Sequence, residues 1–484
     1  MDSDLISIQE ARDLAANARE AQRLWSKANQ IDVDRVCAAM AQAAFSASGR
    51  LGQMAHDETG FGVPEHKKLK NEFGSMKVWE SIKDIRTAGV INVDSIRGVT
   101  EIAWPVGVVA ALTPSTNPTS TVMFKILISV KARDGIVVAP HPSAVNCCAE
   151  TTRIMARAAV DAGAPRGLIS CLEHISLAGT QELMNHRAVA IILATGGTPM
   201  VRAAHSVGKP AYGVGPGNVP VYVDRSADID QAARYITASK AFDYSTICAT
   251  EQSVVADRPI AAQLRESMQA EGAYFVSPEQ AQALRTLLFH ENLVINAAAV
   301  GKSPQVLAAM AGFDIPSFAR ILVAPLTKVG KSEPLSAEKL TTVLGWYEAD
   351  GWEAGCERCI ELINFGGKGH SLSIHARDEK VILAFGLEKP VFRIVVNTMA
   401  TLGAIGLTTG VMPSLTLGAG GIGGSITGDN ISVYHMFNVK RLAHGISAPP
   451  PQALLPGALS SGPTPQQIEA VVRQVVNEIL NAKY

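Results

Sequence analysis

The segment Val106-Gly-Val-Val-Ala-Ala-Leu112, which Thr113-Pro114 follows, decides the fold. It is a short, continuous apolar run ended by a proline, a pattern typical of a strand that is buried on both faces of a sheet. The pattern returns in Ile136–Ala139, Ile191–Ala194 and Val219–Val223. Helical patterns fill the gaps, over about 120–131, 144–162 and 180–186. This alternation predicts an α/β fold with a doubly wound parallel sheet.

The rest of the chain predicts further parts around this sheet. Helices are expected over roughly the first 90 residues, and a second α/β unit is expected to begin after Asp224. Residues 447–465 are rich in proline, with Ala, Leu, Ser and Gly, which predicts a linker. Apolar residues then recur at helical spacing over 466–484, which predicts a short amphipathic helix. Two interpretations of this helix stay open, namely packing within its own protein or oligomer and docking on another protein.

Composition excludes several classes of function. The 484 residues carry 43 Lys and Arg against 44 Asp and Glu, which argues against a nucleic-acid-binding protein. The apolar runs are far shorter than the ~20 residues of a membrane span, and the acidic start lacks the pattern of a secretory signal. Seven cysteines therefore predict reduced thiols in the cytoplasm rather than a disulfide framework. Cys356 and Cys359 have no second pair beside them, so we expect no metal site.

Three glycine-rich segments are candidates for phosphate contact. Gly418-Ala-Gly-Gly-Ile-Gly423 matches the dinucleotide pattern in letters, but loop-like sequence follows it, and we expect a close-packed loop. Thr195-Gly196-Gly197 is the better candidate, because it lies between a predicted strand and a predicted helix over 200–207. A tight strand-to-helix turn without a ligand is the alternative there. The third segment, Gly213-Val-Gly215-Pro-Gly217, precedes the predicted strand Val219–Val223.

Cys248 differs from the other six cysteines. It lies among polar residues between a predicted helix and a predicted strand, just after the boundary between the two units, whereas the others lie in helical or strand-like patterns. A thiol in such a loop can face a cleft, and its thiolate is a strong nucleophile for a carbonyl carbon.

The segments that carry a family resemblance are Ala111–Thr121, Phe124-Lys125, His141-Pro142, Ala194–Gly197, Gly213–Asn218, Phe242–Gln252, Glu338–Leu340, Gly366–His370 and Pro413–Gly418. In this order they closely resemble the CoA-acylating branch of the aldehyde dehydrogenase superfamily, over about residues 5–446. The resemblance implies a Rossmann-type NAD-binding domain over 1–223, completed by 425–446, and a catalytic domain over 224–424.

The resemblance also implies roles for individual residues. Cys248 would attack the aldehyde, and Asn117 with the Cys248 backbone N–H would hold the resulting oxyanion. His370 would orient groups or exchange protons, with a loop-bracing role as the alternative. The residues implied in cofactor binding are His141, Thr195, Gly196, Gly197, Gly215, Gly217 and Glu338. NAD is the expected cofactor and coenzyme A the co-substrate; NADP stays open, because Ala144 stands where the superfamily commonly has a glutamate.

An absent residue indicates the fate of the acyl group. Hydrolytic members of the superfamily have Glu-Leu-Gly-Gly-Lys where this chain has Gly213-Val-Gly-Pro-Gly217. That glutamate activates water, and glycine cannot act as a base, so a CoA thiolate is the expected acceptor. A hydrolytic enzyme with another base, and a non-enzymatic assembly protein, are the competing hypotheses.

The resemblance finally suggests substrate, partners and location. Acetaldehyde or propionaldehyde is expected, and a polar two-carbon aldehyde such as sulfoacetaldehyde is the alternative. The helix over 466–484 resembles the encapsulation peptides of bacterial microcompartment enzymes, which predicts contact with shell proteins. A homodimer or tetramer inside such a compartment in the cytoplasm is the expected setting, with no membrane or nucleic-acid partner.

Overall fold

A computed structural model of the chain describes residues 2–450 and 464–481. The strands of its first sheet are β3 (Val108–Leu112), β4 (Gly135–Ala139), β5 (Ile169–Cys171), β6 (Val189–Thr195) and β7 (Ala211–Val214). They lie in the order β5-β4-β3-β6-β7, and every neighbouring pair is parallel. All five residues of β3 and of β4 are buried, as expected for strands covered on both faces.

The second sheet contains β8 (Val219–Val223), β9 (Glu251–Asp257), β10 (Ala273–Phe275), β11 (Ile321–Pro325), β12 (Val343–Ala349), β13 (Gly369–His375) and β14 (Val391–Val396). Their order is β10-β11-β12-β9-β8-β13-β14, and all the pairs are parallel. A third, small sheet is formed by β1 (Val90–Asp94), β2 (Val99–Pro105) and β15 (Phe437–Ala443), in the order β1-β2-β15.

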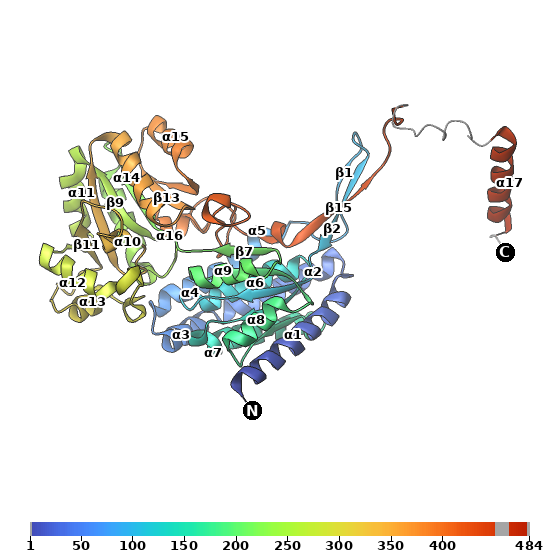
Figure 1. Ribbon diagram of the computed structural model, residues 1–484, viewed down its shortest axis with the longest axis horizontal. Helices are drawn as coiled ribbons and strands as arrows, with labels where there is room; N and C mark the ends of the chain where they lie inside the picture. The colour runs from blue at the N-terminus through green and yellow to red at the C-terminus, as the bar shows by residue number, and fades with distance from the viewer. Residues whose placement is uncertain (1, 451–463, 482–484) are drawn as a thin grey trace. The chain divides into compact units, whose positions relative to one another are not determined.

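Helices of the first half surround the first sheet (Figure 1). They are α1 (Ser3–Trp25), α2 (Gln30–Ser46), α3 (Ser48–Thr59), α4 (Pro64–Glu72), α5 (Val78–Ile82), α6 (Pro118–Lys131), α7 (Val145–Asp161), α8 (Leu177–Asn185) and α9 (Thr198–Ser206). The small side chains Ala11, Ala15 and Ala18 follow one face of α1 and share a core with Val108 and Ala110 of β3. This spacing keeps one stripe of α1 against the sheet.

Helices of the second half cover both faces of the second sheet. They are α10 (Ile229–Ala241), α11 (Arg258–Ala270), α12 (Pro278–Leu288), α13 (Pro304–Met310), α14 (Gly351–Phe365), α15 (Glu379–Glu388) and α16 (Ala400–Gly403). Val221 and Val254 belong to the core under α10 and α11, whereas Tyr222 and Val255 belong to the core under α14 and α15. Alternate residues of each strand thus supply two separate cores.

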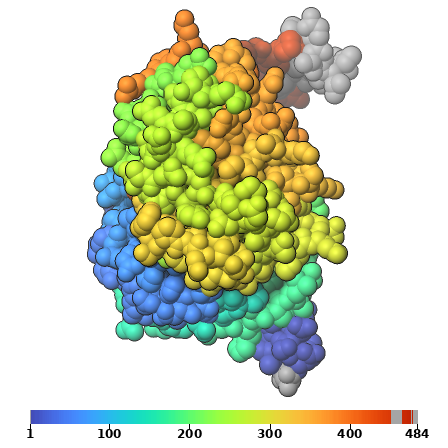
Figure 2. Space-filling view, turned by 90° about the vertical axis from the view of Figure 1, so that its left-hand side faces the viewer, coloured from blue at the N-terminus to red at the C-terminus, as the bar shows by residue number. Residues whose placement is uncertain are grey.

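Both large sheets lie in one compact unit, which runs to Gly89 and from Ala103 to Val439. Within it the blue N-terminal helices and the yellow segment near residue 300 lie side by side (Figure 2), where Lys302 Nζ donates to Gly60 O at 2.8 Å. A second unit comprises 90–102 and the chain from residue 440 onward. In that unit Arg441 Nη2 lies 3.0 Å from Glu101 Oε1.

The structure confirms the predicted fold class but not every predicted strand position. The α/β fold with parallel sheets is confirmed. One strand assignment was wrong, because Val219–Val223 pairs with β9 and β13 in the second sheet and not with the strands of the first. An apolar run reports burial but not the neighbours of a strand, so its sheet could not be read from it. The domain boundary near Val223 stays a prediction.

The C-terminal segment contains α17 (Pro465–Asn481). Ile468, Val471, Val472 and Val475 are each about half exposed, at 46 to 59%. Most of the predicted linker, residues 451–463, lies outside the described residues, as do the last three residues of the chain. No helix in the described part of the chain is long and apolar enough to cross a lipid bilayer.

Candidate active site

A cavity of about 550 Å³ contains most of the predicted site residues. Its lining includes Asn117, His141, Thr195, Gly196, Gly197, Gly215, Cys248 and Glu338. Asn117 follows β3 and Thr195 is the last residue of β6. The carboxyl ends of parallel strands meet at one edge of a sheet, which is where open α/β folds bind ligands. The two remaining predicted residues, Gly217 and His370, contact residues of this lining.

Cys248 and His370 face each other. The Nε2 atom of His370 lies 3.3 Å from the Sγ atom of Cys248. Gly217 permits this approach, because a Cβ at that position would lie 2.4 Å from the Cys248 carbonyl oxygen and 2.9 Å from His370 Nδ1. A side chain at position 217 would therefore push the thiol and the imidazole apart.

A buried arginine helps to assign the His370 tautomer. Arg393 Nε donates to Ser371 Oγ at 3.2 Å, and Ser371 Oγ lies 3.1 Å from His370 Nδ1. The serine oxygen accepts from Arg393, and we assign its own hydrogen to Nδ1. With this assignment the hydrogen of a neutral imidazole lies on Nε2, which then points at the Cys248 sulfur.

The resting thiol and imidazole are both uncharged at neutral pH. Burial, helped by the charge of Glu338, raises the pKa of Cys248 to about 12, although Arg393 and two backbone N–H groups act in the opposite direction. Burial and the charge of Arg393 lower the pKa of His370 to about 3. The sulfur therefore needs stabilising donors to react as a thiolate, and the Nε2–H of His370 is placed to be one.

The Asn117 amide is fixed at both ends. Its Nδ2 donates to Thr246 O at 3.1 Å and to Thr116 Oγ1 at 3.2 Å. Its Oδ1 accepts from the ammonium of Lys70 at 2.5 Å. The amide nitrogen, and not its oxygen, thus lies on the side of the loop that carries Cys248, and one of its two hydrogen bonds has to give way before it can donate to a ligand there.

Glu338 is tied to the loop of Gly217. Its Oε1 accepts from the Gly217 backbone N–H at 2.8 Å. Burial raises the pKa of Glu338 to about 7, although this hydrogen bond and two lysines lower it. Glu338 is also the one carboxylate among the described residues that line the cavity.

The predicted phosphate segment opens α9. Gly197 is the N-cap residue of this nine-residue helix, and no side chain caps it. The Thr195 hydroxyl lies 2.9 Å from that of Thr416. Free N–H groups at a helix start suit an anionic group. At the edge of the same cavity, His141 Nδ1 lies 2.8 Å from Ser143 Oγ.

Gly213 leaves no room for a side chain. A Cβ there would lie 2.7 Å from Val201 Cγ1 and 2.8 Å from His205 Nε2, so position 213 points toward α9. The Gly418–Gly423 loop is packed as closely, because a Cβ on Gly418 would lie 2.2 Å from Thr427 O. The prediction that this segment forms a close-packed loop is thus confirmed.

The cavity lining is largely apolar and carries no fixed cation. Its described lining residues include Phe61, Ile295, Val300, Ile405 and Leu415, and none of them is lysine or arginine. In the described residues, no group of three or more His, Cys, Asp or Glu side chains could hold a metal ion.

Sequence reasoning missed Lys70, Ser371 and Arg393. Lys70 lies in the charged stretch Glu65-His-Lys-Lys-Leu-Lys70, which reads as a solvated helix. Arg393 interrupts an apolar strand, and that interruption was the one available signal.

The chain is similar to known proteins in sequence and in structure. The model of the Aldehyde dehydrogenase family matches residues 4–278. Aldehyde-alcohol dehydrogenase 2 of Entamoeba histolytica is 40% identical over 441 residues, which cover 89% of this chain and 51% of that protein. The chain spans about half the length of the curated aldehyde-alcohol dehydrogenases it matches. Succinate-semialdehyde dehydrogenase (acetylating) of Clostridium kluyveri is 34% identical, with 91% of this chain and 96% of that protein covered.

Two solved structures are similar over most of the chain. An acetylating aldehyde dehydrogenase from Geobacillus thermoglucosidasius is 51% identical with a TM-score of 0.92, covering 93% of this chain and 99% of that one. A propionaldehyde dehydrogenase from the fucose utilisation bacterial microcompartment of Clostridium phytofermentans is 27% identical with a TM-score of 0.81. The match covers 89% of this chain and 96% of that one.

Proposed function

The chain belongs to the aldehyde dehydrogenase family, and from this premise we propose that it oxidises a short-chain aldehyde to an acyl-CoA with NAD. Cys248 is the proposed nucleophile: its thiol proton leaves to solvent, and the thiolate attacks the aldehyde carbon to give a thiohemiacetal oxyanion. The Asn117 amide and the Cys248 backbone N–H hold the negative oxygen. His370 donates from Nε2 to the sulfur and stabilises the thiolate form, which its 3.3 Å distance from Sγ supports.

The residues around α9 fit a nicotinamide dinucleotide. The uncapped start of α9, with Thr195, Gly196 and Gly197, would hold the pyrophosphate, and Gly215, Gly217 and His141 would border it. The Glu338 carboxylate would bind the nicotinamide ribose. When bound, NAD accepts the hydride that leaves the thiohemiacetal carbon, and the acyl group stays on Cys248 as a thioester. NADP is the alternative, and comparing initial rates with the two cofactors decides between them.

The observation that carries the acylating assignment is Gly213. Hydrolytic relatives would need a carboxylate base at this position, and here a Cβ would already collide with Val201 of α9. Glu338 is engaged with the Gly217 N–H. Water attack on the thioester thus lacks a base, and a CoA thiolate, which carries its own nucleophilic charge, is the proposed acceptor. One thioester replaces another, so we expect the step to run in both directions.

An uncharged short aldehyde is the proposed substrate. The absence of lysine and arginine from the described lining argues against an anionic substrate such as succinate semialdehyde or sulfoacetaldehyde. Acetaldehyde and propionaldehyde need only apolar contacts, which Phe61, Ile295 and Val300 can supply.

One assay tests this proposal. Initial NADH formation is measured over a panel of acetaldehyde, propionaldehyde, sulfoacetaldehyde and succinate semialdehyde, with and without CoA. We expect sustained NADH only with CoA and an uncharged aldehyde, and none in Cys248→Ala. Undiminished turnover without CoA, with free acid as the product, would instead identify a hydrolytic enzyme.

A microcompartment setting is proposed for the C-terminal helix. The half-exposed Ile468, Val471, Val472 and Val475 give α17 an apolar face, and the likeness to a microcompartment dehydrogenase supports a shell protein as partner. The enzyme is proposed to act as a homodimer or tetramer in the cytoplasm, inside the compartment. A fluorescent protein fused to residues 447–484 should co-localise with shell proteins, and diffuse fluorescence would contradict the proposal.

A further inference from the structure

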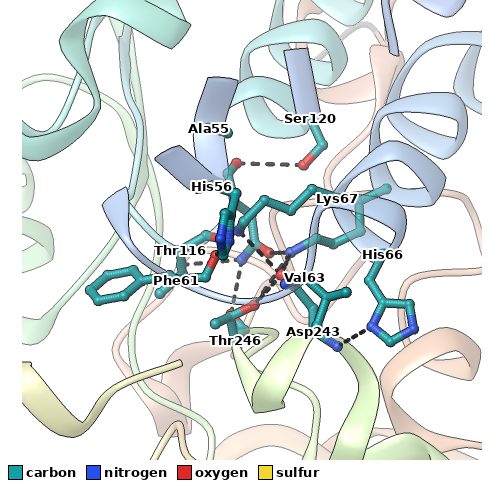
Figure 3. Close-up of polar contacts among 12 residues, drawn as sticks. Ala55, His56, Phe61, Val63, His66, Lys67, Thr116, Ser120, Asp243 and Thr246 are labelled. Carbon is teal, nitrogen blue, oxygen red and sulfur yellow. Dashed lines mark hydrogen bonds and ion pairs between the residues drawn. The ribbon is translucent and has the colours of Figure 1, made fainter. Parts of the chain in front are cut away.

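Two lysines and an aspartate are buried together behind the candidate oxyanion site. The exposed fraction is 2% for the side chains of Lys67 and Lys70 and 0% for Asp243. Lys70 Nζ contacts Asp243 Oδ2, and Lys67 Nζ lies 3.3 Å from the same oxygen. Figure 3 shows Lys67 reaching Asp243 within this cluster. Buried charges persist only when they are paired and hydrogen-bonded, so the cluster needs an explanation.

The position of Asp243 is determined by its surroundings. Its Oδ1 accepts from the Val63 backbone N–H at 2.7 Å, and its own N–H donates to His66 Nδ1 at 2.9 Å. Gly62 provides the space, because a Cβ there would lie 2.0 Å from Asp243 Oδ1. Asp243, Tyr244 and Ser245 have φ angles of 47°, 49° and 68°, a left-handed conformation that non-glycine residues rarely adopt.

The two lysines reach different neighbours. Besides Asp243, Lys70 donates to Asn117 Oδ1 at 2.5 Å and to Thr246 Oγ1 at 3.3 Å. Lys67 donates instead to the backbone oxygen of Thr116 at 3.2 Å. A cation beside an amide can only face its oxygen, so Lys70, together with the accepting carbonyl of Thr246, determines which end of Asn117 is turned toward the Cys248 loop.

We propose that Lys70 is a positioning residue for the proposed reaction, and that it keeps Asn117 Nδ2, rather than Oδ1, on the side of the oxyanion. This role of Lys70 rests on the proposed function, since it requires an oxyanion at Cys248. Without Lys70 the amide could turn over and present Oδ1, an acceptor, to the negative oxygen. The cation also polarises the amide and strengthens Nδ2 as a donor.

The charge of Lys70 strengthens this orientation. Burial lowers its pKa to about 7, although Asp243 acts in the opposite direction and Lys67 in the same. The ammonium can only donate to Asn117 Oδ1, whereas the neutral amine has a lone pair and can also accept from the amide. The orientation is therefore held most firmly below neutral pH, where Lys70 is charged.

A double-mutant cycle tests the proposal, with Lys67→Met as the matched control. The variants Lys70→Met, Lys67→Met and Asn117→Ala are made singly, and each lysine change is combined with Asn117→Ala. The rate of the first NADH turnover with aldehyde, without CoA, reports the step that needs the oxyanion. Loss of one oxyanion donor costs ~10²–10³-fold, so Lys70→Met should slow this turnover by on the order of tenfold or more.

The interaction between the two sites distinguishes positioning from a structural role. In the Asn117→Ala background, Lys70→Met should change the rate less than about twofold, whereas any effect of Lys67→Met should be the same in both backgrounds. An equal effect of Lys70→Met in both backgrounds, or none in wild type, overturns the proposal. If Lys70→Met does not fold, Lys70→Ala, which also lacks a donor, replaces it with the same criteria.

A structural readout separates this proposal from the proposed function. In a crystal structure of Lys70→Met the Asn117 amide should be turned or displaced, while in Lys67→Met it should keep its contact with Thr246. An unchanged amide without Lys70 refutes the positioning role. A wild-type protein that forms no NADH with any aldehyde refutes the proposed function instead, and leaves the crystallographic comparison decisive for Lys70.

Discussion

His370 Nε2 lies 3.3 Å from Cys248 Sγ while its Nδ1 lies 3.1 Å from the Ser371 hydroxyl. The imidazole therefore connects the candidate nucleophile to Ser371 and, through it, to the buried guanidinium of Arg393. With the Ser371 hydroxyl assigned as the donor to Nδ1, the hydrogen bonds form a chain that runs in one direction from Arg393 to the sulfur. Cys248 thus lies at the accepting end of this chain.

Removal of the Ser371 hydroxyl should slow the reaction without harming the fold. Ser371→Ala leaves His370 Nδ1 without a donor, so the hydrogen can move to Nδ1 and Nε2 can no longer donate to the sulfur. The first NADH turnover should fall several-fold. Ser373→Ala is the control, because Ser373 lies on the same strand β13 and donates only weakly, to Val395 O at 3.4 Å. Equal rates in the two variants would contradict the tautomer assignment.

The reactivity of the free thiol should rise with pH without levelling near neutrality. Burial raises the pKa of Cys248 to about 12, so below that pH the thiolate fraction grows tenfold with each pH unit. Alkylation of the ligand-free protein by iodoacetamide, followed on the Cys248 peptide by mass spectrometry, should increase in this way from pH 7 to 9. An alkylation rate that reaches a plateau at or below pH 8 would contradict this prediction, because the Cys248 thiol would then have a pKa far below 12.

Position 213 should reject the catalytic glutamate of hydrolytic relatives. Gly213→Glu should not create CoA-independent turnover, because its side chain would collide with Val201 and His205 rather than reach the thioester. Gly213→Ala should already cost about 1–3 kcal/mol of stability through overpacking. Gly215→Ala is the control, since a Cβ there meets nothing within 4 Å, and thermal unfolding compares the two. Free acid produced by Gly213→Glu without CoA would disprove this account.

The buried carboxyl of Glu251 should make stability depend on pH. Burial raises its pKa to about 7, although Ser239 and the Ala400 N–H donate to it. The folded protein therefore keeps this proton at pH values where the unfolded chain, with an ordinary pKa of about 4.3, has lost it. The free energy of unfolding should fall as pH rises from about 4.3 to about 7.

Comparison with Glu251→Gln isolates this contribution. The wild-type free energy of unfolding minus that of the variant should decrease over this range by at most about 1.4 kcal/mol per pH unit. Urea unfolding of both proteins at pH 5, 6 and 7 measures this difference in the free energy of unfolding. A difference that grows with pH would contradict the raised pKa of Glu251.

The sequence predicts those features whose signal is local. β3 and β4 could be located because five consecutive buried residues read as an apolar run, and Cys248 because its neighbours are polar. β12 is harder to locate from the sequence, since Gly345 and Glu348 interrupt its apolar pattern. β8 was assigned to the wrong sheet because the pairing of a strand depends on chain crossovers that no window of sequence contains.

The supporting residues of the site were beyond such reasoning. Lys70 differs from the exposed Lys68 two positions earlier only in which face of α4 it occupies, and what lies on that face is decided by Asp243, 173 positions later. A buried lysine and a solvated one look the same in the sequence, because the burial of each depends on contacts that form only in the folded chain.

The left-handed turn at Asp243–Ser245 has a consequence for how the enzyme matures. Its backbone is unfavourable for these residues by ~1–2 kcal/mol each, and it is held by contacts with Val63, His66 and Lys70. Until α4 has docked, the contacts that hold this turn, and with it the position of Cys248, are missing. A nascent or partly unfolded chain should therefore carry an ordinary thiol without the neighbouring groups of Asn117 and His370, and hydride transfer to the cofactor would begin only when the fold is complete.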